Sequence, residues 1–188
     1  MRWDDLFGDL EAQLDAAEAA SVDAEVADRA RRESALLTLA GRLGGSLGGR
    51  IGVEVVGAGR VEGRLLEVSD QWLLLADDAP VVAAEVLVVR SAVQSVAGLA
   101  STSDRTSAPA GGQRVRLGLG VALRAIARDR SPVDVRLTGG GTVQGTLERV
   151  GADFVELTEH PAGEVRPRRA GAVRTVPFAA LALVRSRA

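Results

Sequence analysis

The sequence contains no cysteine, no lysine and no tyrosine, and it has a single histidine, His160. Without cysteine there is no disulfide framework, thiolate nucleophile or thiolate metal ligand, and one histidine is too few for a histidine-rich metal site. Only 3% of the residues are aromatic, which argues against a protein that reads single strands by stacking bases on aromatic rings. We therefore expect no metal and no other cofactor.

The sequence also lacks a secretory signal and a clean membrane span. Its opening, MRWDDLFGDLEAQ, carries acids where a signal peptide has a basic region followed by an apolar one. The most apolar run, residues 81–99, is interrupted by Glu85, Arg90 and Gln94, whereas a spanning helix needs about 20 apolar residues. We expect a cytoplasmic chain in which this run forms two buried strands.

Charge is distributed unevenly along the chain. Residues 1–28 carry a net charge of −8, residues 29–103 are balanced, and residues 104–188 carry +6. Such asymmetry predicts two electrostatic faces. The candidate nucleic-acid-binding residues are the arginines of the last segment that lie on or beside its predicted helix and its longest loop: Arg114, Arg116, Arg124, Arg128, Arg130, Arg166, Arg168, Arg169 and Arg174.

Residues 1–33 are predicted to be helical and acidic. Apolar residues recur at spacings of three and four from Trp3 through Leu10 and Leu14, with acids between them, as in an amphipathic helix. The first turn is a candidate docking surface for a protein partner, formed by Trp3, Asp4, Asp5, Leu6 and Phe7. The alternative is that the same stripe packs on the chain itself or on another copy.

Two stretches of the sequence have nearly the same pattern: GRVEGRLLEVSDQWLLL from Gly59 and GTVQGTLERVGADFVEL from Gly141, 82 positions later. The last apolar strands of the two halves align at an offset of 88. Each half begins with a helical pattern, so we predict one helix and five short strands, used twice. The expected units are residues 34–100 and 113–188, joined by the linker 101–112.

Glycine and aromatic positions within this pattern indicate small barrels. Five short strands close into a barrel only if some of them bend sharply, and Gly63 and Gly145 lie where a Cβ atom would obstruct the bend. We expect Trp72 and Phe154 to fill the interiors. The fold class is therefore mainly β with helices, comprising two SH3-like five-stranded barrels, each preceded by a helix, after an acidic N-terminal helix.

A short helix followed by five bent strands, with G-x-V-x-G-x-L entering the second strand, resembles the Sm-like (LSm-type) family. The resemblance covers residues 34–99 and 114–186, and it implies RNA binding and assembly through the fourth and fifth strands. The family's R-G pair is not matched, because Arg90-Ser91 and Val176-Pro177 occupy those positions. The opening RWDDLF is similar to that of actinobacterial proteins, some of them labelled as transcriptional regulators.

Other motifs are better explained by structure than by chemistry. The stretch VEVVGAGRVEG (53–63) imitates a dinucleotide fingerprint, but strand-like residues follow it where a helix would hold the pyrophosphate, so we interpret it as a hairpin turn. We expect His160 to lie in a solvated loop and the Asp77-Asp78 pair to mark a hairpin tip rather than a Mg²⁺ site. No catalytic residue is predicted.

The expected function is that of a non-enzymatic interaction or scaffold protein. It would assemble through the edges of the apolar fourth and fifth strands, because unpaired apolar edges invite aggregation, and through the acidic N-terminal helix. The alternative is a regulatory protein that binds RNA or DNA with the arginine-rich second half. The expected partners are another protein or a second copy of the chain, with no membrane and no small-molecule substrate.

Overall fold

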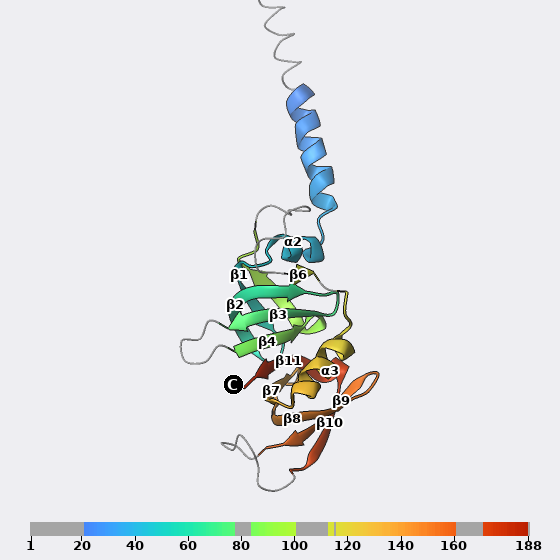
Figure 1. Cartoon of the computed structure of the whole chain (residues 1–188). Helices are drawn as coiled ribbons and strands as arrows, with labels where there is room; N and C mark the ends of the chain where they lie inside the picture. The colour runs from blue at the N-terminus through green and yellow to red at the C-terminus, as the bar shows by residue number, and fades with distance from the viewer. Residues whose placement is uncertain (1–20, 78–83, 101–112, 115, 161–170, 188) are drawn as a thin grey trace, which may run out of the picture. The chain divides into compact units, whose positions relative to one another are not determined.

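The structure is a computed structural model that describes residues 21–77, 84–100, 113–114, 116–160 and 171–187. Contacts divide the chain into two units, residues 1–38 and residues 39–188. In the first unit, residues 21–35 form a helix in which every side chain except that of Asp28 is exposed. All the strands belong to the second unit, which makes the described chain mainly β (Figure 1).

The second unit contains two sets of strands, each preceded by a helix. The first set comprises α2 (Leu39–Gly45), β1 (Arg50–Val55), β2 (Gly59–Val68), β3 (Trp72–Asp77), β4 (Ala84–Val89), the 3₁₀ turn η1 (Arg90–Ala92) and β5 (Val93–Ala97). The short strand β6 (Gln113–Arg114) pairs in parallel with β2. The second set comprises α3 (Leu119–Asp129), β7 (Pro132–Leu137), β8 (Thr142–Val150), β9 (Phe154–Glu159), β10 (Val173–Pro177), η2 (Phe178–Ala180) and β11 (Leu181–Ser186).

The two sets share one continuous antiparallel sheet, which runs in the order β10-β9-β8-β7-β11-β4-β3-β2-β1-β5 without closing. Within each set the last strand pairs with the first, β5 with β1 and β11 with β7. Trp72 of β3 lies opposite Val89 of β4. Their counterparts in the second set, Phe154 (82 positions later) and Pro177 (88 positions later), also lie opposite each other. The two sets therefore have the same strand order and the same register between their third and fourth strands.

The strands bend at positions that the sequence indicates. A Cβ atom on Gly63 would lie 2.2 Å from the carbonyl oxygen of Ala76, and one on Gly145 would lie 2.3 Å from that of Thr158. Two residues after each glycine the ladder to the next strand has a bulge, at Leu65 and at Leu147. Both glycines are thus required by the close approach of the neighbouring strand, as predicted.

The bent sheet encloses two apolar clusters. The first gathers side chains of α2 and β1–β4 together with Ala182 and Leu183 of β11. The second gathers side chains of α3 and the second strand set together with Trp72, Leu87 and Val89 of the first set. Each cluster therefore contains residues from both halves of the sequence.

The prediction that Trp72 and Phe154 fill the interiors of their own halves is wrong. Trp72 is 3% exposed, but it packs in the second cluster, on the face of β3 opposite the first. Phe154 is half-buried and covers Gly151, where a Cβ atom would lie 2.4 Å from the ring. The cause is strand alternation, because a strand's first residue can point to either face of the sheet and only the register decides which.

Helix boundaries also differ from the prediction. The N-terminal helix, predicted within residues 1–33, extends to residue 35, and the helix that was expected to lead the unit 34–100 begins only at Leu39. The helix that was expected to lead the unit 113–188 begins only at Leu119, since Gly118 has an extended backbone and acts as its N-cap. Glycine offers no side chain to the first helical N–H, and Gln71 Oε1 accepts the bond from Leu119 N at 2.6 Å instead.

We predict that Gly63→Ala destabilises the protein by roughly 1–3 kcal/mol, because the added methyl group would overlap a carbonyl oxygen in a packed sheet. Gly145→Ala should behave in the same way. The matched control is Gly139→Ala, where the added Cβ would meet nothing within 4 Å and φ is not positive. Urea unfolding of the three variants checks this, and equal stability of Gly63→Ala and Gly139→Ala would contradict it.

Candidate functional site

The centre of the second unit is a junction between the two strand sets, formed by β4 and β11. These strands pair antiparallel, with Leu183 opposite Val88 and Val184 opposite Leu87, and they lie side by side in Figure 1. All the side chains from Val86 to Val89 and from Leu181 to Val184 are buried. The predicted edge pairing of the apolar fourth and fifth strands is thus found within the chain for β4 and β11.

The junction makes β4 a strand that serves both apolar clusters. Val86 and Val88 belong to the first cluster, whereas Leu87 and Val89 belong to the second. Successive side chains of a strand point to opposite faces, so the part of β4 that has an apolar cluster on each face, Val86 to Val89, is apolar at every position. This explains why the run is continuous rather than alternating.

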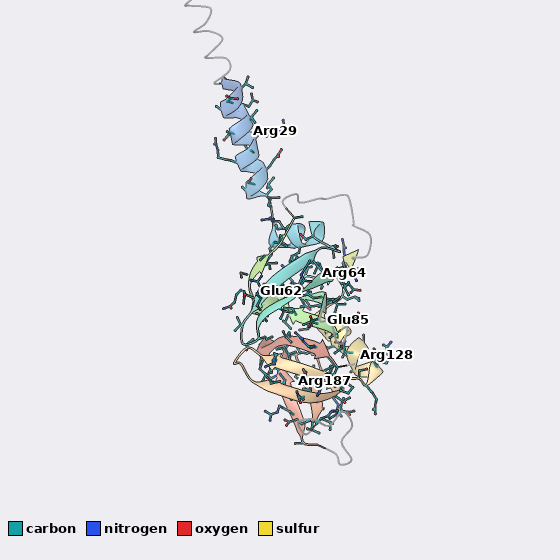
Figure 2. All side chains as sticks on the ribbon, turned by 90° about the vertical axis from the view of Figure 1, so that its left-hand side faces the viewer. Arg29, Glu62, Arg64, Glu85, Arg128 and Arg187 are labelled. Carbon is teal, nitrogen blue, oxygen red and sulfur yellow. The ribbon has the colours of Figure 1, made fainter. Side chains whose placement is uncertain are left out.

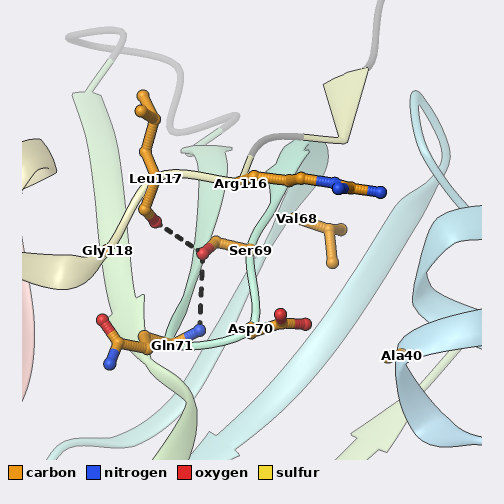
Figure 3. Close-up of a pocket in the computed structure, with 8 residues that line it drawn as sticks. All are labelled: Ala40, Val68, Ser69, Asp70, Gln71, Arg116, Leu117 and Gly118. Atoms are coloured by element: carbon orange, nitrogen blue, oxygen red, sulfur yellow. Dashed lines mark hydrogen bonds between the residues drawn. The ribbon is translucent and has the colours of Figure 1, made fainter.

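A second contact attaches the start of α3 to the first strand set. The carbonyl oxygen of Leu117 accepts hydrogen bonds from Ser69 Oγ at 2.8 Å and from Trp72 Nε1 at 2.9 Å. Figure 3 shows Ser69 between Leu117 and the backbone N–H of Gln71. Ser69, Gln71 and Leu117 line a cleft of about 730 Å³ that also includes Arg116. The Ser69 hydroxyl, the Leu117 carbonyl and the Gln71 amide oxygen already hold the chain in place, so we assign the cleft a structural role.

On another side of the junction, hairpins of the two sets meet. A Cβ atom on Gly57, which has φ 71°, would lie 2.2 Å from the carbonyl oxygen of Leu137. This left-handed glycine belongs to the turn between β1 and β2, and β2 follows it as a strand. The sequence VEVVGAGRVEG is therefore a hairpin turn, as interpreted, rather than a strand-to-helix nucleotide loop.

Near these hairpins, Arg60, Arg136 and Arg185 line a small cleft of about 180 Å³. Each of the three already interacts with another side chain. Arg185 Nη1 lies 2.7 Å from Asp77 Oδ2, and Arg136 Nη1 donates to Thr142 Oγ1 at 2.7 Å. Arg60 Nε lies 2.7 Å from a carboxylate oxygen of Glu62. Hydrogen bonds from Arg60, and then from Arg50, lower the pKa of the exposed Glu62 carboxyl. Because these arginines already have side-chain partners, we interpret the cleft as a structural contact and not as a binding site for anions.

The junction leaves the two ends of the sheet without a paired strand in the described part of the chain. At one end β5 pairs only with β1, and at the other β10 pairs only with β9. Their residues are more polar than those of the junction, since Gln94, Ser95, Arg174 and Thr175 are all exposed. These ends are candidate edges for a further strand.

Beside the junction lies an apolar groove of about 270 Å³. Its floor includes Leu74 of β3 and Leu87 of β4, and one wall is the face of α3 that carries Ala122, Ala125 and Ile126. Carboxylates stand along its rim, namely Glu67, Glu85 and Asp129. Figure 2 shows Glu85 at the level of the junction and Arg128 on α3. Sequence reasoning missed this groove, because its parts come from β2, β3, β4, β11 and α3.

The structure divides the predicted arginine set. Arg124 and Arg128 are exposed on α3, and Arg130 follows as its C-cap. Arg130 and Arg174 each form an ion pair, with Glu148 and Glu159 respectively. Arg116 lies apart from these at the cleft beside Ser69. Arg114 belongs to β6, where only its backbone is described, and three further predicted arginines lie outside the described residues: Arg166, Arg168 and Arg169.

Two further predictions from the sequence concern the N-terminal docking residues and the Asp77-Asp78 pair. The predicted docking residues Trp3, Asp4, Asp5, Leu6 and Phe7 lie outside the described residues; their role stays a prediction, and loss of partner recovery on deleting residues 1–19 would test it. Asp77 ends β3 and pairs with Arg185, whereas Asp78 lies outside the described residues.

The expectation of a solvated His160 is wrong. This residue is half-buried, with Nε2 3.1 Å from Thr146 Oγ1, and its Nδ1 is shielded from solvent and has no hydrogen-bond partner among the described residues. The shielding arises because His160 continues directly from β9, and its backbone N–H bonds to the carbonyl oxygen of Gln144 on β8.

Within the described ranges, no helix has the length and apolar character needed to cross a membrane. The same ranges contain no cluster of histidine, aspartate or glutamate side chains arranged to hold a metal ion. Comparison with known protein families, curated proteins and solved structures found no match for this chain. The candidate sites therefore rest on the chain's own geometry.

We predict that Val88→Asp destabilises the protein by more than about 3 kcal/mol, since it places a carboxylate among the aliphatic side chains of the first apolar cluster. Val88 is fully buried and lies opposite Leu183 in the junction. The control is Ser95→Asp on β5, the counterpart of Leu183 by the offset of 88, where the side chain is exposed. Thermal unfolding followed by circular dichroism measures both. The junction would lose its importance if the two variants melted together.

Proposed function

We propose that this chain is a non-enzymatic interaction protein, built of two fused Sm-like units, that assembles through its strand edges. The observation that carries the proposal is the junction itself, where the fourth strand of one set pairs with the fifth strand of the other. The shared strand order and the matching registers support the view that the sets are copies of one unit. The same type of pairing, between the fourth strand of one unit and the fifth strand of another, can also form between two chains.

The two end strands are the counterparts of the junction strands. By the offset of 88, β10 corresponds to β4 and β5 corresponds to β11. Pairing of β10 in one chain with β5 in the next would repeat the junction between chains. Such head-to-tail contacts are heterologous, so they close into a ring or extend as a filament, depending on the rotation between copies.

The register of this pairing follows from the junction. Val184 lies opposite Leu87 there, and the same offset places Val96 opposite Thr175. Pro177 does not prevent the pairing, since its counterpart Val89 lies outside the junction ladder, which extends from Val86 to Val88. The proline removes a donor that the ladder does not use.

The end strands are suited to reversible rather than permanent pairing. Positions that are apolar and buried at the junction are exposed and polar at the ends, as at Ser95 and Thr175. Polar residues on an edge limit uncontrolled aggregation, while backbone hydrogen bonds remain available to a partner in the correct register. We infer an association that depends on the concentration of the chain.

Disulfide trapping tests the assembly, because the chain has no native cysteine. Val96→Cys chains mixed with Thr175→Cys chains should form a disulfide-linked dimer under mild oxidation, since residues directly opposite each other lie within disulfide reach. Val96→Cys mixed with Val173→Cys is the control, because Val173 lies about 7 Å further along the same edge. Non-reducing gels and light scattering give the readout.

The assembly proposal is wrong if no linked dimer forms and the mass of the wild-type chain stays that of a monomer at all concentrations. It is also wrong if both cysteine pairs link at the same rate, since linking would then reflect random collision. Efficient disulfide formation between Val96→Cys and Thr175→Cys, but not in the control pair, supports pairing of β5 with β10 in the register of the junction.

The second candidate function is binding of RNA or DNA. It is favoured by Arg124 and Arg128, which are exposed one turn apart on α3 and form no ion pair among the described residues. Arginine suits phosphate groups. Their neighbours Arg130 and Arg174 each have an acidic partner within the chain, which reduces their contribution.

For this candidate, we predict that Arg124→Glu with Arg128→Glu weakens the binding of labelled single-stranded RNA and duplex DNA at least about tenfold at low salt, with a smaller effect at high salt. Arg60→Glu, on β2, is the control for charge alone. Fluorescence anisotropy at two salt concentrations measures binding. If neither nucleic acid binds at low salt, and purified protein shows no excess absorbance at 260 nm, this candidate is rejected.

A further inference from the structure

We propose that the groove between α3 and the first strand set binds a peptide segment of a protein partner in which an aliphatic or aromatic anchor is flanked by arginine or lysine. The groove, defined by Leu74, Leu87, Ala122, Ala125 and Ile126 with the rim carboxylates Glu67, Glu85 and Asp129, is called the acidic-rimmed groove below. This site differs from the strand ends, and it does not depend on their assembly.

The groove is hollow because α3 presents small side chains to it. Leu119 and Leu123 fill the second apolar cluster on one face of the helix, whereas Ala122 and Ala125 lie on the adjoining face. Leucine in place of either alanine would occupy space that is open in this structure. The remaining surface is largely aliphatic, with Leu74 and Ile126 only half-buried, so an apolar side chain can gain burial there.

The charges around the groove are not compensated. In the described part of residues 39–188, most carboxylates form an ion pair with an arginine, as Glu62, Asp77 and Asp134 do. The carboxylates without an ion pair there are Glu67, Glu85, Asp129 and Asp153. All but Asp153 line the acidic-rimmed groove.

Uncompensated charge at this place is informative because arginine is abundant nearby. Arg128 precedes Asp129 on α3, yet it forms no ion pair with any described carboxylate, and neither does Arg64 on β2. Three like charges around an apolar surface repel one another weakly and attract a cation strongly once water is excluded. The rim therefore favours a ligand that is both apolar and cationic.

The size of the groove indicates a side chain of a larger molecule. At about 270 Å³, it is no larger than the smallest sites that enclose a whole small ligand, which have about 300 Å³. It can hold one or two anchor side chains, while the rest of the segment lies along the rim. Phosphate groups are disfavoured, since three carboxylates would repel them.

A direct test uses a fluorescein-labelled peptide of about twelve residues, enough for three helical turns, with leucines at i, i+3 and i+4 and arginines elsewhere. Two matched peptides replace the leucines by serine or the arginines by glutamate. Binding to the full chain is measured by anisotropy, and amide shifts of Leu117, Ala122 and Ile126 by NMR. We expect only the leucine–arginine peptide to shift these amides and to bind tightly, since arginines alone can be attracted only weakly, also to the acidic residues 1–28.

The protein variants separate the groove from general attraction. Ala125→Leu should weaken binding at least about tenfold, because it fills the groove while keeping a good helix former. Glu85→Arg with Glu67→Arg should weaken it at least as much. Asp153→Arg, at the unpaired carboxylate outside the groove, should change it less than about twofold. Thermal melts show whether each variant is folded.

The proposal is overturned if the leucine–arginine peptide fails to bind at about 1 mM, the weakest affinity of interest. It is overturned equally if the serine peptide binds as tightly, which would mean attraction by charge alone, or if Ala125→Leu binds as wild type does. Linking of Val96 with Thr175 can succeed or fail independently of these results, so failure of the groove and failure of the strand-edge assembly are distinguishable.

Discussion

The structure depends on one strand, β4, having an apolar cluster on each of its two faces. It pairs with β3 of its own set and with β11 of the other, and its side chains alternate between the two apolar clusters. Neither cluster is complete without it. A charge at this strand or its partner would therefore expose apolar surface in both halves, so we expect the second unit to unfold as one cooperative body.

The junction also creates the surfaces that carry the functional proposals. Pairing β4 with β11 leaves β5 and β10 as the ends of the sheet, and it brings α3 beside the outer face of β3 and β4. Each end strand has one edge without a paired strand in the described part of the chain, and the register proposed for pairing there is that of β4 with β11. The acidic-rimmed groove instead offers an apolar surface and unpaired carboxylates. The two proposed contact sites, which differ in their chemistry, thus both depend on this one pairing.

Much of the fold could be predicted from residues whose requirements are local. Gly63 and Gly145 identify the bends, because only glycine tolerates a carbonyl oxygen so close to its Cα. Gly57 identifies a hairpin turn by its positive φ. The start of α3 and the place of Trp72 could not be predicted, since Gln71 supplies the helix cap from a distant loop and register decides which face the tryptophan occupies.

By itself the sequence determined the strands, their bends and turns, and the apolar character of β4 and β11, because these follow from local periodicity and glycine geometry. Only the tertiary structure decided which edges meet. A continuous apolar strand has the same pattern whether its second face is covered by its own set, by the other set or by another chain. Likewise, the acidic rim gathers Glu67, Glu85 and Asp129 from three elements, and no local pattern links residues that only folding brings together.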